Sequence, residues 1–207
     1  MRKRFVVIDD FYKDPRAMRS AALGLEYSAQ SGHTYPGRNS SAPILDSQIT
    51  DAVSQAVGTP LEPNSTQLCG HFRTSTASDT FEQDVHVDPD PNTLWAGVLY
   101  LNTPKQCEGR PGTITWRHKR LGIESVPMSR EEGRALGFSS YEDVRRELIY
   151  GDGLDRSKWD MVNYAAMRFN RLVMFRPTDW HSHGENFGSS LEDCRLVQIF
   201  FWRRKSG

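Results

Sequence analysis

From about residue 65 to its C-terminus, the chain is dominated by short segments rich in β-branched and aromatic residues and bounded by turn residues. Such segments at hairpin spacing, without regularly alternating helices, are typical of all-β sandwiches and barrels. They predict a mainly β fold with helical additions, in the form of a double-stranded β-helix (jelly roll or cupin-like). The segments are residues 65–76, 84–88, 94–102, 112–119, 170–177 and 194–203.

The N-terminal part, residues 1–64, is expected to contain an opening strand and two helices. Asp14 followed by Pro15 is typical of a helix start, because aspartate caps the first turn and proline fits its first position. We expect this helix to extend to about Tyr27. Gly58 predicts the end of the second helix, because glycine readily adopts the left-handed conformation found there.

The chain of 207 residues is long enough to bury one sizeable core, so we expect a single domain over residues 1–207. Its jelly-roll strands would fall within residues 65–116 and 168–204. Between them, residues 117–167 predict a helical insertion in which Ser140 caps a helix. Additions on a β scaffold often carry specificity, so this insertion could be a lid over an active site. It could equally be the contact surface of a homodimer.

Composition and charge argue against several classes of partner. Lys plus Arg and Asp plus Glu number 26 each, and no basic stripe carries interleaved aromatic residues, so we expect no nucleic-acid binding. No apolar stretch has the length of a membrane span, and the N-terminal apolar run stops at Asp9, too early for a signal peptide. Cys69, Cys107 and Cys194 lack zinc-site spacing, and we expect reduced thiols in a cytoplasmic protein.

His86 and Asp88 lie two residues apart in one predicted strand, so their side chains project from the same face. The strand rise separates them by roughly 6–7 Å, which is close enough for both to reach one metal ion. Alone, this pair also fits an exposed polar strand edge. Asp90 is an alternative carboxylate, but it follows Pro89, where the alternation of a strand is lost.

His181 follows the apolar strand Leu172–Phe175, far along the chain from the first two candidates. Two histidines and one carboxylate form the facial triad of iron(II) oxygenases, which leaves adjacent coordination positions open. Arg195 begins the last strand among apolar neighbours. A buried arginine requires an anionic partner, and its planar guanidinium suits bidentate binding of a carboxylate.

Together, His86-x-Asp88, the distant His181 and Arg195 resemble the iron(II)- and 2-oxoglutarate-dependent dioxygenases. The resemblance includes the order of the surrounding strands and covers roughly residues 65–202. The stretches "RHKRLG", "NRLVMF" and "WHSHGENFG" further resemble a bacterial branch of that superfamily.

The resemblance implies that His86, Asp88 and His181 hold Fe(II), while Arg195 binds the distal carboxylate of the co-substrate 2-oxoglutarate. Reaction with O2 would yield succinate and CO2 and hydroxylate a C–H bond of a small molecule or of an amino-acid or peptidyl substrate. Because related halogenases lack the carboxylate ligand, Asp88 argues against halogenation. Desaturation and cyclisation remain open.

Two positions depart from the pattern of the superfamily. Many members carry serine or threonine two residues after the arginine, where this chain has Val197. Tyr100 or Thr113 could supply the missing hydroxyl contact to the co-substrate. His183 shares strand alternation with His181, so either could be the distal ligand. We prefer His181, because it directly follows the apolar strand and its turn.

Several further residues are candidates for contact with the substrate: His71, Arg73, His118, Trp180 and His183. Each also has a structural interpretation, as a satisfied core histidine, a solvated arginine or, for Trp180, part of the wall beside the metal ligand. Sequence alone does not choose the substrate.

Two other functional classes remain possible. A cupin-like metalloenzyme, an isomerase or hydrolase, could use the same three ligands with zinc or manganese, and it would have no need of Arg195. In a non-catalytic jelly-roll binding module, the triad would be fortuitous. Binding of 2-oxoglutarate separates the first class from an oxygenase, and metal uptake separates the second.

Overall fold

The computed structural model describes residues 3–29, 37–80, 84–88 and 90–206. One sheet contains the strands β1 (Phe5–Ile8), β2 (Tyr27–Ser28), β3 (Arg38–Ser40), β4 (Leu61–Pro63), β5 (Phe72–Ser75), β6 (Trp95–Tyr100), β9 (Leu172–Phe175) and β11 (Arg195–Arg204). A smaller sheet contains β7 (Thr113–His118), β8 (Trp159–Ala165) and β10 (His181–Ser182).

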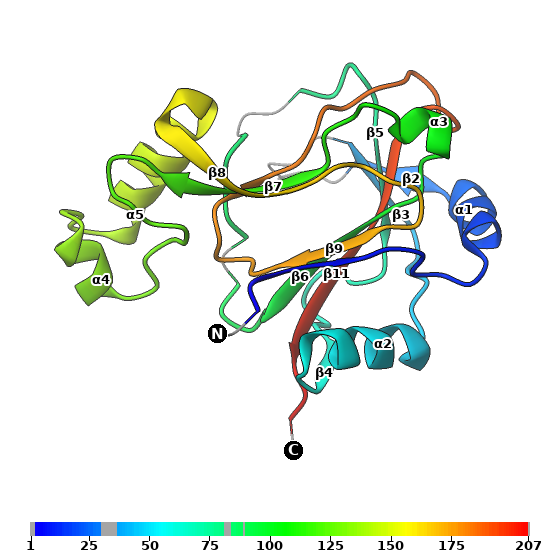
Figure 1. The fold of residues 1–207 in the computed structure, drawn as a ribbon, viewed down its shortest axis with the longest axis horizontal. Coiled ribbons are helices and arrows are strands. Elements are labelled where there is room, and N and C mark those ends of the chain that lie inside the picture. The colour runs from blue at the N-terminus through cyan, green and yellow to red at the C-terminus, as the bar shows by residue number, and fades with distance from the viewer. Residues whose placement is uncertain (1–2, 30–36, 81–83, 89, 207) are drawn as a thin grey trace.

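The larger sheet has the strand order β1-β9-β6-β11-β5-β3-β2, with β4 also paired to β11, and the smaller has the order β10-β7-β8. Every strand pair in the described residues is antiparallel. The smaller sheet lies over β9, β6 and β11 (Figure 1). This arrangement confirms the predicted mainly β architecture.

Helices are short and lie outside the two sheets. They are α1 (Pro15–Leu23), α2 (Ser47–Val57), α3 (Pro104–Cys107), α4 (Arg130–Ala135), α5 (Tyr141–Val144), η1 (Arg145–Ile149), η2 (Asp152–Leu154) and η3 (Arg156–Lys158). Within the described part of the chain, none combines the length and apolar character needed to cross a bilayer.

Alternation along the central strands divides the larger sheet between two cores. On its outer face, Leu172 and Leu196 pack in a cluster with Ala22 of α1 and Val53 of α2, so both helices cover this face (Figure 1). The intervening residues of β9 and β11 form a second cluster, which includes Ala165 of β8 in the smaller sheet. The inner face therefore points toward the smaller sheet.

Both N-terminal helices begin and end on the expected residue types. The Asp14 side chain caps α1, with Pro15 in its first turn, and Gly58 ends α2 with a φ of 68°. However, α1 stops at Leu23, before the predicted end at Tyr27. The helix ends early because of a tertiary contact: Tyr27 is the first residue of β2, and it pairs with β3.

Two predicted strands form only in part. Of residues 65–76, only Phe72–Ser75 are a strand. The segment 84–88 makes a single β-bridge, between His86 and His181. The amide of the preceding residue, Val85, donates instead to a helical carbonyl of the insertion, so the ladder does not extend. Pro89, which was expected to end this strand, lies outside the described residues.

The predicted helical insertion, residues 117–167, is too wide. Trp159–Ala165 form strand β8 and pair with β7, which itself extends to His118. Residues 159–165 pair with β7 through their backbone, and this tertiary pairing overrides the helical expectation. Within the predicted insertion, helical structure is thus confined to residues 119–158.

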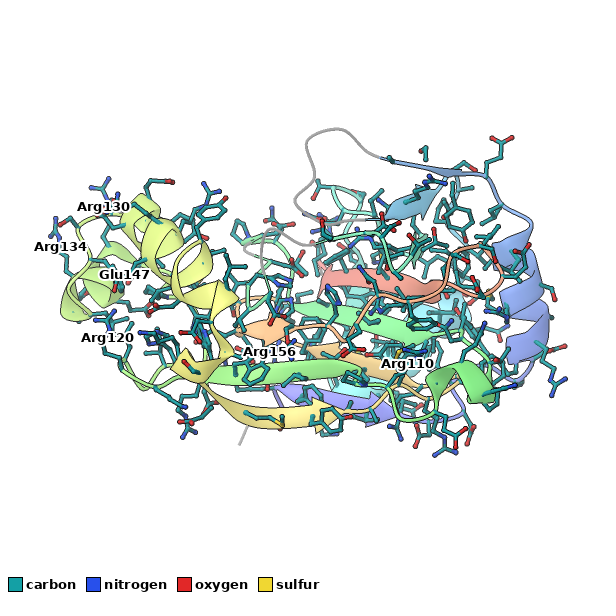
Figure 2. The ribbon with its side chains drawn as sticks, turned by 90° about the horizontal axis from the view of Figure 1, so that it is seen from above. Arg110, Arg120, Arg130, Arg134, Glu147 and Arg156 are labelled. Atoms are coloured by element: carbon teal, nitrogen blue, oxygen red, sulfur yellow. The ribbon has the colours of Figure 1, made fainter. Side chains whose placement is uncertain are left out.

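The insertion projects beyond the end of the sheets (Figures 1 and 2). Its outer helices carry charged side chains such as Arg130 and Arg134, and Arg120 pairs with Glu147. Nearer the sheets, Arg156 pairs with Asp84 (Figure 2 shows its position), which ties the insertion to the segment that precedes His86.

Candidate metal centre

Two short segments, residues 84–88 and 177–183, lie side by side although they are far apart in the sequence. The amide of His86 donates to the carbonyl of His181 at 2.9 Å, and the amide of His181 donates back to the carbonyl of His86 at 2.9 Å. The amide of Asp88 donates to the carbonyl of Pro177 at 2.8 Å. These bonds hold the two segments in register.

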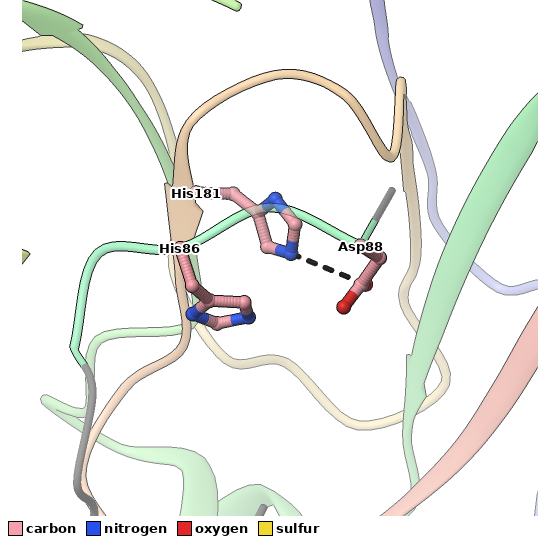
Figure 3. Close-up of side chains that lie close together, drawn as sticks. All are labelled: His86, Asp88 and His181. Carbon is pink, nitrogen blue, oxygen red and sulfur yellow. Dashed lines mark ion pairs between the residues drawn. The ribbon is translucent and has the colours of Figure 1, made fainter. Parts of the chain in front are cut away.

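The three predicted ligands meet at this bridge. One ligand atom from each of His86, Asp88 and His181 lies within 4.8 Å of the others. His181 Nε2 and Asp88 Oδ2 are 3.4 Å apart, and Figure 3 shows the two imidazoles and the carboxylate directed into a common space. Two imidazoles and a carboxylate at this separation match the donor set of a facial triad.

The opposite ring nitrogens fix the orientation of both imidazoles. His86 Nδ1 lies 2.9 Å from the carbonyl oxygen of Asp84, and His181 Nδ1 lies 2.7 Å from that of Asp179. Because a carbonyl only accepts, each Nδ1 donates its proton, which leaves Nε2 as the ring nitrogen available to a metal. Such backbone partners are typical of metal-binding histidines.

Burial further favours the neutral, ligating form of His86. Desolvation lowers the pKa of this imidazole to about 4, and the neighbouring His181 contributes in the same direction. At neutral pH the ring is therefore uncharged, which is the form that binds a metal.

The reverse side of the same two segments is apolar. Val85 and Val87, which alternate with the ligands, and Trp180 belong to a cluster built largely by the helical insertion. Gly153 of the insertion accepts the Val85 amide at 2.9 Å, and a Cβ at Gly153 would lie only 2.6 Å from the Val85 carbonyl oxygen. The insertion thus packs closely against the backbone of the segment that carries His86.

The ligands open onto a cavity of about 680 Å³. Its walls come from both sheets: β5, β6, β9 and β11 of the larger one, and β10 with Thr113 of β7 in the smaller one. Every described residue that lines it lies outside 117–167, so the insertion contributes no wall to this cavity. A volume of this size accommodates small organic molecules.

Arg195 lies in the wall of this cavity and is only 4% exposed. Its Nε has no hydrogen-bond partner in the described part of the protein. Burial lowers the pKa of Arg195, while nearby Tyr100 acts in the opposite direction. A buried guanidinium that lines a cavity and keeps an unsatisfied donor fits an anion, because leaving such a charge uncompensated is costly.

Both hydroxyl groups proposed to assist Arg195 lie together. Tyr100 Oη and Thr113 Oγ1 are 2.7 Å apart, and Thr113 lines the cavity. Val197, which stands where a hydroxyl was expected, also lines the cavity as an apolar wall. The structure thus offers a pair of hydroxyl groups, one from β6 and one from β7 of the smaller sheet, in place of one on β11.

The remaining candidates divide into two groups. His71, Arg73 and His183 line the cavity. His118 and Trp180, predicted as substrate contacts, do not: each is at most 1% exposed. His118 instead bonds Asp152 at 2.9 Å within the insertion, and the indole of Trp180 packs against that of Trp159, because both face the insertion core.

The two alternative ligands, Asp90 and His183, do not belong to the three-residue cluster. Asp90 accepts hydrogen bonds from Asn64, Gln67 and Thr93, so its carboxylate holds a turn together at the cavity wall. His183 lines the cavity without joining the three-ligand group.

Sequence reasoning missed several polar residues that line the cavity, namely Ser65, Thr66, Gln67, Ser75, Thr93, Ser182 and Asn186. Ser75 could have been found, because it alternates with Arg73 along β5. Asn186 lies in an irregular segment, where no periodic signal exists.

Comparison with solved structures places the architecture among oxygenases. HygX from Streptomyces hygroscopicus, crystallised with nickel and 2-oxoglutarate, is 14% identical, with a TM-score of 0.56 over 99% of this chain and 84% of HygX. SnoK, a non-heme alpha ketoglutarate dependent carbocyclase from nogalamycin biosynthesis, is also 14% identical, with a TM-score of 0.54 over 98% of this chain and 81% of SnoK.

At this identity the likeness concerns the fold, and it confirms the predicted jelly roll of the iron(II)/2-oxoglutarate oxygenases. None of the curated proteins is similar in sequence to this chain. A family model described as a family of unknown function, DUF6445, matches residues 1–193. The chain is therefore a member of the DUF6445 family, and it has the fold of the 2-oxoglutarate-dependent oxygenases.

Proposed function

We propose that this protein is a non-haem iron(II)/2-oxoglutarate-dependent oxygenase that hydroxylates a C–H bond of a small molecule or amino-acid-like substrate. The supporting observation is that one cavity contains both the His86, Asp88 and His181 cluster and the buried guanidinium of Arg195. A hydrolytic or isomerising metal site would have no use for that guanidinium.

His86, Asp88 and His181 would hold Fe(II), and Arg195 would bind the distal carboxylate of 2-oxoglutarate. Bound together with O2, these groups supply an oxidant strong enough to break a C–H bond, with succinate and CO2 as co-products. The Nδ1 bonds to Asp84 and Asp179 keep both imidazoles oriented toward the metal.

Apolar residues of the larger sheet contribute in a different way. Ala96, Val98, Val197 and Ile199 line the cavity beside these polar groups. They limit the access of water, so the attraction between Arg195 and a carboxylate is stronger than it would be in bulk solvent.

The test is succinate formation from 2-oxoglutarate by protein reconstituted anaerobically with Fe(II) and then exposed to air. We expect slow substrate-independent turnover that requires both Fe(II) and O2. Fe(II) protein that forms no succinate and does not bind 2-oxoglutarate in calorimetry would instead favour a cupin-like isomerase or hydrolase.

A matched pair of variants identifies the distal ligand. His181→Ala should abolish stoichiometric Fe(II) binding and succinate formation, since the triad loses one of its three donors. His183→Ala should retain Fe(II) binding, because His183 is not part of the three-ligand group. The reverse result would assign the ligand to His183.

A further inference from the structure

The inner face of the larger sheet changes character along β11. Arg195, at the start of this strand, is paired with Ser75 of β5. Val197, Ile199 and Phe201 follow at alternate positions, so they share the face of Arg195. All four of these β11 residues line the cavity. The wall along β11 therefore runs from a buried charge at one end to an aromatic ring at the other.

The candidate metal ligands lie toward the aromatic end. The ring of His181 packs against that of Phe175 of β9, with 4.4 Å between the ring centroids. Phe175 is paired with Ala96 of β6, and Ala96 is paired with Phe201, so these three residues form one row across three strands. His181 thus contacts the row that contains Phe201. Arg195 is roughly 20 Å from Phe201 along the strand.

Three apolar residues at this end are only partly buried: Leu68, Val98 and Phe201. Each packs at the edge of the cluster on the inner face, and each lines the cavity. Val98 lies one row from Phe201, because it is paired with Ile199. The amide of Gly70 donates to the carbonyl of Ile199 at 2.8 Å, which holds the segment of Leu68 beside β11. These three side chains thus form an apolar surface in the cavity, and covering it with an apolar ligand group is favourable.

The polar residues that flank this apolar surface are neutral or acidic. Residues 65–67 contribute serine, threonine and glutamine, and the turn before β6 contributes Asp90 and Thr93. No lysine occurs among the described lining residues, and their two arginines, Arg73 and Arg195, belong to the other end of the wall. Arg73 lies diagonally beside Arg195, because it is paired with Val197. The apolar surface therefore suits an uncharged group.

The co-substrate does not account for this surface. 2-Oxoglutarate is a short diacid, and its charged groups would lie at the metal and at Arg195. An apolar wall does not favour such groups, because they lose water without gaining a partner. A cavity of about 680 Å³ has room for a second small molecule beside it.

We propose that Leu68, Val98 and Phe201 bind an uncharged alkyl or aromatic group of the substrate, so that the substrate is a hydrophobic small molecule. This assignment depends on the proposed oxygenase function for the reaction, and it adds the chemical class of the substrate. The contact of His181 with the row of Phe201 places the bound group on the metal side of the cavity, where the C–H bond must lie.

The test uses zinc-loaded protein, which is diamagnetic and does not turn over. The probes are the linear alcohols butanol, pentanol and hexanol, together with hexanediol, which has the length of hexanol but a hydroxyl group at both ends. Titrations followed by saturation-transfer NMR give dissociation constants in the millimolar range. We expect the affinity to rise about fourfold per methylene group, which corresponds to about 0.8 kcal/mol. Hexanediol should bind about tenfold more weakly than hexanol, because its second hydroxyl loses water.

Two variants remove parts of the surface independently. Phe201→Ala should weaken hexanol binding about tenfold, and Leu68→Ala should weaken it several-fold, with a smaller gain per methylene group in both. Cooperative urea unfolding shows which variants are folded, and Leu68→Ala decides if Phe201→Ala is not. The matched control is Phe5→Ala. Phe5 is a partly buried member of the same cluster and is paired with Phe175, but it does not line the cavity, so hexanol binding should be unchanged.

Saturating 2-oxoglutarate should not displace hexanol, because the two ligands would occupy opposite ends of the wall. The assignment is wrong if hexanediol binds as tightly as hexanol, or if either folded variant of Leu68 or Phe201 binds hexanol as the wild type does. It is equally wrong if Phe5→Ala weakens hexanol binding as much as Phe201→Ala. Displacement by 2-oxoglutarate would assign the surface to the co-substrate instead. If 2-oxoglutarate does not bind the wild-type protein, the proposed function fails, whereas Phe201-dependent binding of hexanol can still be measured.

Discussion

The two faces of the ligand-bearing segments differ sharply. Facing the cavity, His86, Asp88 and His181 are polar and converge on one point. Facing the insertion, Val85 and Trp180 are completely buried in an apolar cluster. Because alternate residues of an extended chain point to opposite sides, each segment contributes to chemistry with one face and to stability with the other.

The insertion does not line the cavity, but its contacts hold the segment that carries His86 in place. It therefore supports the candidate metal centre from the other face. It contacts the two residues that precede His86, because the carbonyl of Gly153 accepts from the Val85 amide and the Arg156 side chain pairs with the Asp84 carboxylate. Substitutions on the cavity face should therefore mainly affect metal binding and activity. Substitutions on the insertion face should mainly lower the free energy of unfolding.

The largest effect is expected for Asp88→Ala on the cavity face. Loss of the carboxylate should abolish succinate formation and weaken metal binding by more than about 100-fold, the upper range for loss of an outer partner. Calorimetric titration with Mn(II) and a succinate assay measure both. Asp90→Ala is the matched control and should keep metal binding. A variant of Asp88 that still binds metal normally would contradict the triad.

Trp180→Ala on the insertion face should lower the free energy of unfolding by about 3–5 kcal/mol, as for other buried large-to-small aromatic changes. Urea denaturation of the metal-free protein measures this loss. The control is His183→Ala, on the cavity side of the same segment, which should cost much less. Equal losses in the two variants would remove the distinction between the faces.

Arg195→Met should raise the dissociation constant of 2-oxoglutarate about 100-fold, as expected when a charge-assisted bidentate partner worth about 2–3 kcal/mol is removed. Metal affinity should be unchanged. The ligand-free protein should be as stable as wild type or more stable, because a buried, incompletely bonded charge is replaced by an apolar side chain. Marked destabilisation would show that Arg195 has a structural role instead.

The smallest effect is expected for Asp152→Asn within the insertion. It weakens the bond to buried His118, and the free energy of unfolding should fall by about 1 kcal/mol. Metal affinity, measured by titration with Mn(II), should stay within about twofold of wild type. A large loss of metal affinity at unchanged stability would mean that the insertion tunes the site directly.

Much of the site could be predicted because its signals are local or follow a familiar pattern. His86 and Asp88 share a face by simple alternation, and His181 and Arg195 each stand at an edge of an apolar strand. By contrast, the position of His118 could not be predicted, because residues 113–116 of β7 are buried on both faces and alternation alone does not say which face borders the cavity. Trp180 directly precedes His181, so alternation does place these two side chains on opposite sides.

The sequence by itself determined the β character of the chain, the helix starts at Asp14 and Ser140, and the residue types of the metal centre. These follow from short-range periodicity and capping, which depend on neighbouring residues only. Tertiary structure decided that residues 159–165 pair as a strand and that the insertion lies behind the ligands. It also decided that Arg73 stands beside Arg195. Those relations depend on the pairing of distant strands, and strand register is set by the packing of the whole sheet.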